Sequence, residues 1–552
     1  MKQIELINKR KRNEKHFLQE DGTIVAKIYG DDVHYLKNGK YEEIDNTLVE
    51  DGDSYTNKSN DYKIHFEKKS KNSLMNLEKE SHYLNIKLKE ANEIQISKRK
   101  GISKLMEEVS YDNIYDGIDI EYKTLPTKVK ETIVLHHKPV DNMIFTVDTN
   151  LTLELEKGYI LAKENNNTIF TIEKPYMEDS NGIRNDNIYY EIKQNNGKYE
   201  IELVLDKEWL NSNDTVYPVY IDPTISNNSQ NGNVYDTYIY PGDTGVDKNS
   251  QAILKAGVEK VNGTNRINRA LIKFDLPEIG TGSEIVNASL HLIGYPAVTG
   301  NNFEQIVEIH RVIEDWKEET ATWDQMNNKY DEKVESVQFA KRSTVTDNQI
   351  DPYSSYYNDL TNLVKKWYRD TPNYGILIKS AYEDDYVNDN YPAFFSKNNS
   401  VQGENPKPVL TITYRNQNGL ESYLNYSTQS FTDGSTYMNT YNGNLVGQFL
   451  IGKTIGGKLP VSLNLIYNTN DVIVKQDGFK FNLIQTIRSI TLENNEYLEY
   501  EDEDGTIHYF YKDNESDSPL FHDEDGLSLT VVKENNNYIM SDKYGNKKLF
   551  LQ

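Results

Sequence analysis

The chain has no cysteine, which excludes a disulfide framework, a thiolate zinc site and a cysteine nucleophile. It has no run of about 18 apolar residues, the length a transmembrane helix needs, so we expect no membrane span. Positive charge is scarce, because 61 Lys and Arg residues face 86 Asp and Glu residues, giving a formal net charge of -25. That balance disfavours duplex nucleic acid and anionic membranes as partners, because both attract basic surfaces.

Several signatures of catalytic and metal sites are also missing. The ten histidines form no H-E-x-x-H motif, and no G-x-S-x-G nucleophile elbow occurs. A formal phosphate-loop match, Gly447–Thr454, is followed by glycines and a proline instead of a helix-forming segment, so we interpret it as a coincidence within β structure. We expect no cofactor, and structural calcium is the one ion considered. Asp243 and Asp247 are its candidate ligands, although their spacing does not match an EF-hand loop.

What the sequence has in abundance is tyrosine. Only 37% of the 552 residues are hydrophobic, and low hydrophobicity with high net charge is typical of disordered chains. The 41 tyrosines oppose that interpretation, because each supplies apolar area to a core while keeping a polar tip. We therefore expect a folded protein made of thin layers with much solvated surface.

Short alternating strands dominate the pattern. Thr23–Tyr29, Asp61–Phe66 and Ile118–Tyr122 alternate apolar and polar residues, and Asp-Gly or Asn-Gly turns separate such runs. Alternation predicts antiparallel sheets with one buried and one solvated face. The predicted fold class is all-β, with successive antiparallel β domains.

Length and composition shifts predict about three domains, since domains usually contain about 100–200 residues. The polar stretch after residue 225 has the composition of a linker, and a second polar stretch begins near residue 415. The predicted domains are residues 1–225, 226–415 and 416–552.

The second region contains an ordered series of motifs: Asp236–Ile239, Arg269–Pro277, Ala288–Leu292, Val312 with Trp316, Glu318, Thr322 and Trp323, then Asp359 with Thr361, Val364 and Trp367, and finally Asn373–Lys379 and Pro408–Tyr414. In these motifs and their order the region resembles the DNRLRE domain, a β-sandwich related to carbohydrate-binding modules. The resemblance implies a central, jelly-roll-like sandwich whose surface binds a polysaccharide.

Leu459–Leu463 and Gly505–Phe510 follow the second region and carry a further resemblance. They look like the opening of the β shell of bacterial wall-associated Rhs/YD-repeat proteins, which implies that residues 416–552 begin such a shell. In that family, YD repeats and a variable toxin follow. Met1–His16 has no apolar segment behind its positive charges, so it does not read as a Sec-type signal peptide.

These observations lead to a non-enzymatic, secreted or cell-wall protein whose central sandwich binds a wall or matrix polysaccharide. Arg269 and Lys273 are candidate contacts to acidic sugars, and Trp323 is a candidate stacking residue. Alternation places Arg269, Leu271 and Lys273 on one face, so that face is expected to be only partly exposed. The alternative is a structural cap or scaffold of an Rhs-type polymorphic toxin, which would bind the rest of the toxin and not a glycan. An enzyme acting on wall polymers is a third hypothesis.

Overall fold

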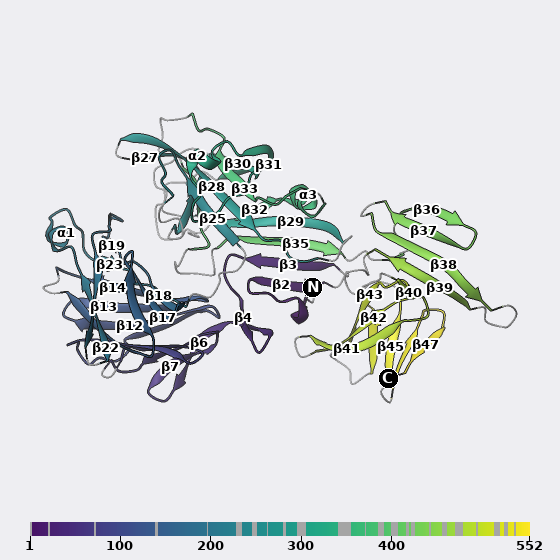
Figure 1. Ribbon diagram of the computed structural model, residues 1–552, viewed down its shortest axis with the longest axis horizontal. Helices are drawn as coiled ribbons and strands as arrows, with labels where there is room; N and C mark the ends of the chain where they lie inside the picture. The colour runs from purple at the N-terminus through teal and green to yellow at the C-terminus, as the bar shows by residue number, and fades with distance from the viewer. Residues whose placement is uncertain are drawn as a thin grey trace, which may run out of the picture.

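A computed structural model shows a chain built almost entirely from antiparallel strands, which confirms the all-β class (Figure 1). None of its described helices is long and apolar enough to cross a membrane. The structure describes residues 3–551 except 20–22, 71–72, 139–141, 196, 228–233, 246–250, 262, 280–282, 295–304, 340–354, 370, 385–390, 399–406, 416–418, 421–424, 441–442, 455–460, 470–478, 493–494, 513–518, 524–527 and 535–536.

The N-terminal sandwich packs an eight-stranded sheet against an eleven-stranded sheet around one apolar core. The eight-stranded sheet has the order β21 (Tyr189–Asn195), β22 (Lys198–Val204), β15 (Met143–Thr149), β10 (His82–Leu88), β9 (Met75–Lys79), β8 (Lys63–Glu67), β7 (Ser54–Ser59) and β6 (Asp45–Asp51). The other has the order β11 (Lys98–Ser103), β12 (Met106–Tyr115), β13 (Ile118–Thr124), β14 (Lys128–Leu135), β24 (Ile225–Ser226), β18 (Asn167–Ile172), β17 (Tyr159–Glu164) and β16 (Thr152–Glu156), with β19 (Met177–Glu178), β20 (Arg184–Asn185) and β23 (Val219–Ile221) attached. A short helix, α1 (Lys207–Asn211), follows β22.

The central sandwich also has two main sheets with a shared core. The β29 sheet has the order β1 (Ile4–Glu5), β2 (Glu14–Leu18), β3 (Ile24–Tyr29), β35 (Val409–Arg415), β29 (Glu284–Ile293) and β32 (Ser355–Asp359). The β28 sheet has the order β25 (Val234–Ile239), β28 (Thr264–Phe274), β33 (Ile376–Ser380), β30 (Gln305–Val312) and β31 (Tyr330–Phe339), with β27 (Gly257–Val261) paired to β28. Smaller elements are η1 (Ile7–Lys9), α2 (Trp323–Met326), α3 (Thr361–Arg369), the pair β26 (Ile253–Lys255) and β34 (Ala393–Phe395), and the hairpin β4 (His34–Lys37) and β5 (Lys40–Glu43).

The first strands of the chain belong to the central sandwich. Strand β3 pairs antiparallel with β35, with Ile24 opposite Tyr414 and Ile28 opposite Leu410. Figure 1 shows the purple β2 and β3 beside the green β35. The apolar residues of β3 alternate inward and lie in the same core as β35. Residues 4–29 thus share a core with the region after residue 233, and the N-terminal sandwich lies between these two parts in sequence. The predicted domain limits stay a prediction.

Two further sheets follow the central sandwich. The first has the order β36 (Tyr426–Phe431), β37 (Gly434–Asn439), β38 (Leu445–Lys453), β39 (Ser462–Asn468) and β40 (Phe479–Phe481). Residues 447–453 of the formal phosphate-loop match lie in β38, as strand backbone. The second is a meander of β41 (Thr486–Leu492), β42 (Asn495–Glu501), β43 (Ile507–Lys512), β44 (Leu520–Asp523), β45 (Thr530–Glu534), β46 (Asn537–Ser541) and β47 (Lys547–Phe550), with its own core.

Candidate functional site

The outer face of the β28 sheet carries the predicted residues Arg269 and Lys273. Ala270 and Ile272 are fully buried in the core between the two sheets. Because side chains alternate along a strand, Arg269, Leu271 and Lys273 point to the opposite face. Leu271 is nevertheless fully buried, in a second apolar cluster outside the sandwich core. The outer face is therefore partly covered, as its alternation predicted.

The cover is the segment 313–329, which includes α2. Trp316, Ala321 and Met326 from this segment are buried together with Leu271. The indole Nε1 of Trp316 donates a hydrogen bond of 2.8 Å to the carbonyl oxygen of Tyr374. A buried indole N–H that is paired in this way fixes its ring, since leaving the donor unpaired would be unfavourable.

Arg269 lies beneath this cover with its guanidinium held on several sides. Its Nε donates to Glu383 Oε1 at 2.8 Å and its Nη2 to Glu383 Oε2 at 2.7 Å. It also donates to the carbonyl oxygen of Asn327. The guanidinium carbon is 4.7 Å from the centre of the Trp323 ring, a cation–π distance. Because both side chains of the Arg269–Glu383 pair are 11% exposed, this two-point ion pair is a fixed part of the fold.

Lys273, four residues further along β28, is also mostly buried, but its acidic partner is exposed. Its Nζ donates to Asp315 Oδ1 at 3.1 Å and to the carbonyl oxygen of Trp316 at 3.3 Å. The same nitrogen lies 4.9 Å from the Tyr235 ring centre and 5.4 Å from that of Trp316. Asp315 is 65% exposed, and the hydrogen bond from Lys273 lowers its pKa. Asp315, the acidic partner in this pair, faces water, so another anion can replace it as the partner of Lys273.

Trp323, the third predicted residue, begins α2 and is partly buried. It packs against the outer apolar cluster, with Arg269 over its ring. The structure thus brings Arg269 and Trp323 into contact and places Lys273 beside Trp316. The binding of sugar by Arg269, Lys273 and Trp323 stays a prediction.

The predicted calcium ligands are only half described. Asp243 lies in a turn after β25, where its Oδ1 accepts a hydrogen bond of 2.9 Å from the Gly245 amide. Asp247 lies outside the described residues. The calcium pair therefore stays a prediction.

A buried charged set beneath the cover was not singled out from sequence. Lys397 Nζ lies 3.1 Å from Glu318 Oε1, while Asp236 accepts hydrogen bonds from Ser396 Oγ at 2.7 Å and from the Lys397 amide at 2.6 Å. Burial raises the pKa of Glu318 to about 7, although Lys397 opposes this shift. Glu318 follows Trp316 in the motif that guided the resemblance, and its contact ties segment 313–329 to the chain around residue 397.

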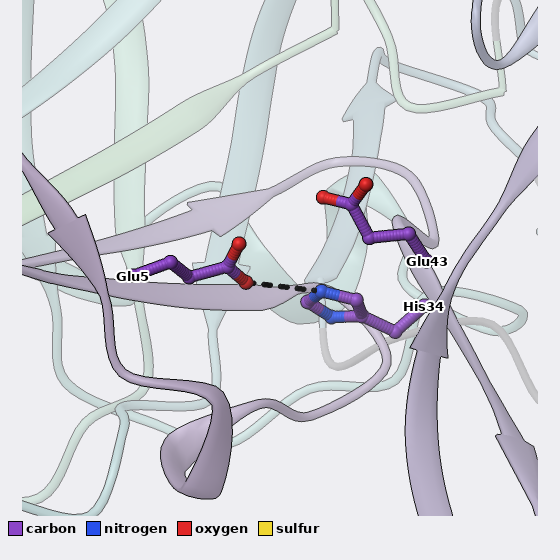
Figure 2. A group of neighbouring side chains, drawn as sticks. All are labelled: Glu5, His34 and Glu43. Atoms are coloured by element: carbon purple, nitrogen blue, oxygen red, sulfur yellow. Dashed lines mark ion pairs between the residues drawn. The ribbon is translucent and has the colours of Figure 1, made fainter. Parts of the chain in front are cut away.

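A second group missed from sequence joins the N-terminal strands to the hairpin β4–β5. Glu5, His34 and Glu43 place potential ligand atoms within 4.8 Å of one another (Figure 2). His34 donates from Nδ1 to the carbonyl oxygen of Lys11 at 2.7 Å, and its Nε2 faces Glu5 Oε1 at 3.4 Å. The residues are far apart in sequence and carry no motif spacing, so only the fold brings them together.

Cations already neutralise this group. Arg10 donates to both carboxylate oxygens of Glu5, at 2.6 and 2.8 Å, and Lys15 pairs with Glu43. Burial disfavours the charged form of Glu5, but the adjacent His34 ring, the hydrogen bonds from Arg10 and the charge of Lys15 outweigh it and hold its pKa at about 2. A divalent ion would add two positive charges beside Arg10 and Lys15. We therefore interpret the group as an ion-pair network that fixes the hairpin on the first strands.

Comparison with known proteins identifies relatives of the chain. Residues 229–414 match the family model of Carbohydrate-binding module family 96. The chain is 25% identical over 467 residues to tRNA nuclease WapA of Bacillus subtilis (strain 168), a match covering 78% of this chain and 19% of that protein. It is 26% identical over 195 residues to a wall-associated protein of Geobacillus stearothermophilus, covering 33% of this chain and 77% of that protein. A match like the first also exists to tRNA(Glu)-specific nuclease WapA of Bacillus subtilis subsp. natto, at 25% identity, 78% of this chain and 19% of that protein.

The matches support a wall-associated protein that contains a carbohydrate-binding module. The chain spans about a fifth of the length of the WapA relatives, at 19%. The expectation of a non-enzymatic protein is contradicted, because these relatives are named as nucleases. That expectation rested on the catalytic motifs missing from these 552 residues, which match 19% of the length of the relatives named as nucleases. Because the relatives are named as tRNA nucleases, the expectation that the protein has no nucleic-acid partner is also weakened.

Proposed function

We propose that the central sandwich binds a polysaccharide of the bacterial cell wall and holds the protein at the cell surface. The outer face of the β28 sheet receives acidic groups of that polymer. The observation that carries this proposal is the Lys273 ammonium, which lies between the rings of Tyr235 and Trp316 and has a solvent-exposed acid as its partner. The match of residues 229–414 to a carbohydrate-binding module family supports it.

The ion pair of Lys273 with Asp315 is the exchangeable part of this surface. Asp315 is 65% exposed and can move into water, whereas the Lys273 side chain is 14% exposed and then needs another anion as its partner. A carboxylate or phosphate of the polymer then accepts the hydrogen bond that Asp315 accepts now.

Arg269 acts differently in this proposal, as a positioning residue. Its charge is matched by Glu383 at 2.7 Å, and the pair is mostly buried. Its guanidinium lies on the Trp323 ring and so fixes the angle of the indole. The part of Trp323 that stays accessible offers an aromatic surface to a sugar ring.

The test measures binding of the whole chain to purified Bacillus subtilis cell walls and to polygalacturonate, a polymer of carboxylated sugars. The whole chain is needed because β1–β3 form part of the sandwich. We expect Lys273→Gln to weaken binding about ten-fold, the loss of one charged hydrogen bond. Lys87→Gln, which alters an exposed lysine of the N-terminal sandwich, is the matched control and should bind normally.

Absence of binding to both polymers would defeat the proposal and favour the alternative, a scaffold that binds protein. Equal binding by the Lys273→Gln and Lys87→Gln variants would show that the polysaccharide site does not include the outer face of the β28 sheet.

We also propose that the protein shares the nuclease activity for which its WapA relatives are named. The support is the match over 78% of this chain, which covers 19% of the relative. Incubating the protein with total tRNA and looking for cleavage products tests this proposal, and intact tRNA after prolonged incubation would count against it.

A further inference from the structure

The outer face of the β29 sheet is the second solvent-facing surface of the central sandwich. On β29, Ala288, Leu290 and Leu292 are buried in the sandwich core, so Ser289 and His291 point outward. The same alternation points Thr411 outward on β35. On β32, Tyr356 packs against the core and Tyr357 points to solvent. These outward side chains all come from residues inside the 229–414 match.

Two aromatic rings are stacked on this face. His291 lies directly opposite Tyr357 in the register of β29 and β32. The ring centres are 4.4 Å apart and the planes differ by 7°. Tyr357 is 72% exposed, an unusual exposure for so large an apolar ring. With one side of the phenol ring on His291, its other side is open to water.

The stacked pair is uncharged. Burial lowers the pKa of His291, so its ring is neutral at physiological pH. Charged side chains on this face include Glu284 opposite Arg415, Asp359, and Lys27 of β3 opposite Thr411. Next to the ring pair the face carries hydroxyl groups, since Ser289 is paired in register with Thr411. An exposed ring beside neutral hydroxyls suits an uncharged ligand with an apolar face and a polar rim.

We propose that Tyr357, supported by His291, is a stacking platform for an uncharged sugar ring of a polysaccharide. The C–H groups on one face of a pyranose pack on the open phenol ring, while Ser289 and Thr411 bond the sugar hydroxyls. The inference rests on the proposed function, because it belongs to the same module. It adds a second, chemically different surface, so that neutral sugars contact the β29 sheet and acidic groups contact the β28 sheet.

The charge of the face favours sugar over nucleic acid. Binding RNA requires Lys or Arg near the backbone phosphates, in addition to a ring for the base. A lysine does reach this face, Lys27 opposite Thr411, but its strand β3 is three strands away from β32. The acid Asp359 is closer to the ring, two residues from Tyr357 on the same face. An uncharged sugar meets no such repulsion.

The experiment titrates the whole chain with three uncharged hexasaccharides, cellohexaose, mannohexaose and N-acetylchitohexaose, by isothermal calorimetry. We expect at least one to bind, and Tyr357→Ala to weaken that binding about ten-fold. Tyr357→Phe should retain binding, because the ring remains. Tyr544→Ala removes a tyrosine that is 79% exposed in the C-terminal meander and should have no effect. Thermal unfolding of each variant verifies that the fold is intact.

Failure of all three hexasaccharides to bind, or equal binding by the wild type and Tyr357→Ala, overturns the inference. Binding of tRNA that depends on Tyr357 while no hexasaccharide binds would reassign the platform to a nucleobase and also overturns it. The two proposals can fail separately. A wild-type chain that binds a hexasaccharide but neither cell walls nor polygalacturonate would defeat only the acidic-sugar site. Binding of the wild type to those polymers without binding of any hexasaccharide would defeat only the stacking platform.

Discussion

At the scale of single residues, the protein places several carboxyl groups where water cannot reach them. Glu131, on β14, points into the core of the N-terminal sandwich, and its Oε1 has no hydrogen-bond partner within the described part of the chain. Burial, with the nearby charge of Asp222, raises its pKa from 4.5 to about 8. A carboxyl group in such surroundings keeps its proton at neutral pH, because the charged form would be poorly solvated.

This shift predicts a pH-dependent stability. Between pH 4.5 and about 8 the folded protein keeps a proton on Glu131 that the unfolded chain has released. The free energy of unfolding therefore falls as pH rises through this range, by up to about 4 kcal/mol from this one group. Glu131→Gln removes the proton exchange, so its stability should fall less with pH. Urea unfolding of both proteins at pH 5 and pH 8.5 measures the difference, and parallel pH profiles would contradict the prediction.

Arg269 supplies a second prediction at this scale. Lysine cannot reproduce the two parallel hydrogen bonds to Glu383, so Arg269→Lys should lower the free energy of unfolding of the central sandwich by about 1–3 kcal/mol. Arg311→Lys is a matched control, because Arg311 also bonds Asp331 at two points but at a more exposed site. Its expected effect is below about 1 kcal/mol. Denaturant titration compares the two, and an equal effect would show that burial does not strengthen the Arg269 pair.

At the scale of elements, backbone geometry fixes how β33 enters the β28 sheet. Gly375, just before β33, has φ +82°, and a Cβ there would lie 2.3 Å from the carbonyl oxygen of Ile272. Gly263, in the turn between β27 and β28, has φ +79° but no heavy atom within 4 Å of such a Cβ. A side chain at Gly263 would meet backbone strain alone, whereas a side chain at Gly375 would meet backbone strain and a steric clash.

Substituting alanine at each position tests this distinction. Gly263→Ala should cost about 1 kcal/mol, the strain of a left-handed alanine. Gly375→Ala should cost about 3 kcal/mol or more, because β33 must also move away from β28. Thermal unfolding of the two variants provides the measurement. Equal melting temperatures would mean that the sheet adapts freely at Gly375.

At the scale of the whole molecule, the chain leaves the central sandwich after β3 and returns to it at β25, with the N-terminal sandwich in between (Figure 1). Ion pairs lie near the point where the chain leaves the central sandwich. Arg12 pairs with Asp32 at 3.1 Å and also lies 3.8 Å from Asp61, which belongs to the N-terminal sandwich. Strand β3 also pairs along β35, which would otherwise be an exposed edge open to association.

This arrangement predicts long-range effects of substitutions near the N-terminus. Ile28→Ala empties a fully buried position opposite Leu410 and should destabilise the central sandwich by about 2–4 kcal/mol. Hydrogen exchange should then show weaker protection in β35 and β29, with β12–β14 unchanged. Ile86→Ala, at a buried position of the N-terminal sandwich, should give the reverse pattern. Loss of protection confined to residues before 226 in the Ile28 variant would contradict the shared core.

The sequence by itself determined the fold class and the direction of individual side chains. Turn residues and alternation over two positions are local properties, so they identified the strands and placed Arg269, Leu271 and Lys273 on one face. Ordered motifs located the central module, which the family match over residues 229–414 supports.

Only the tertiary structure decided which strands meet and which charges are already paired. Alternation gives the face of a strand but not its partner, because pairing over hundreds of residues depends on which sheet edges are available. The pairing of β3 with β35, the neutralisation of Arg269 by Glu383 and the stacking of His291 on Tyr357 therefore had no local signal. Each joins residues that become neighbours only when separate parts of the chain bury their apolar faces together.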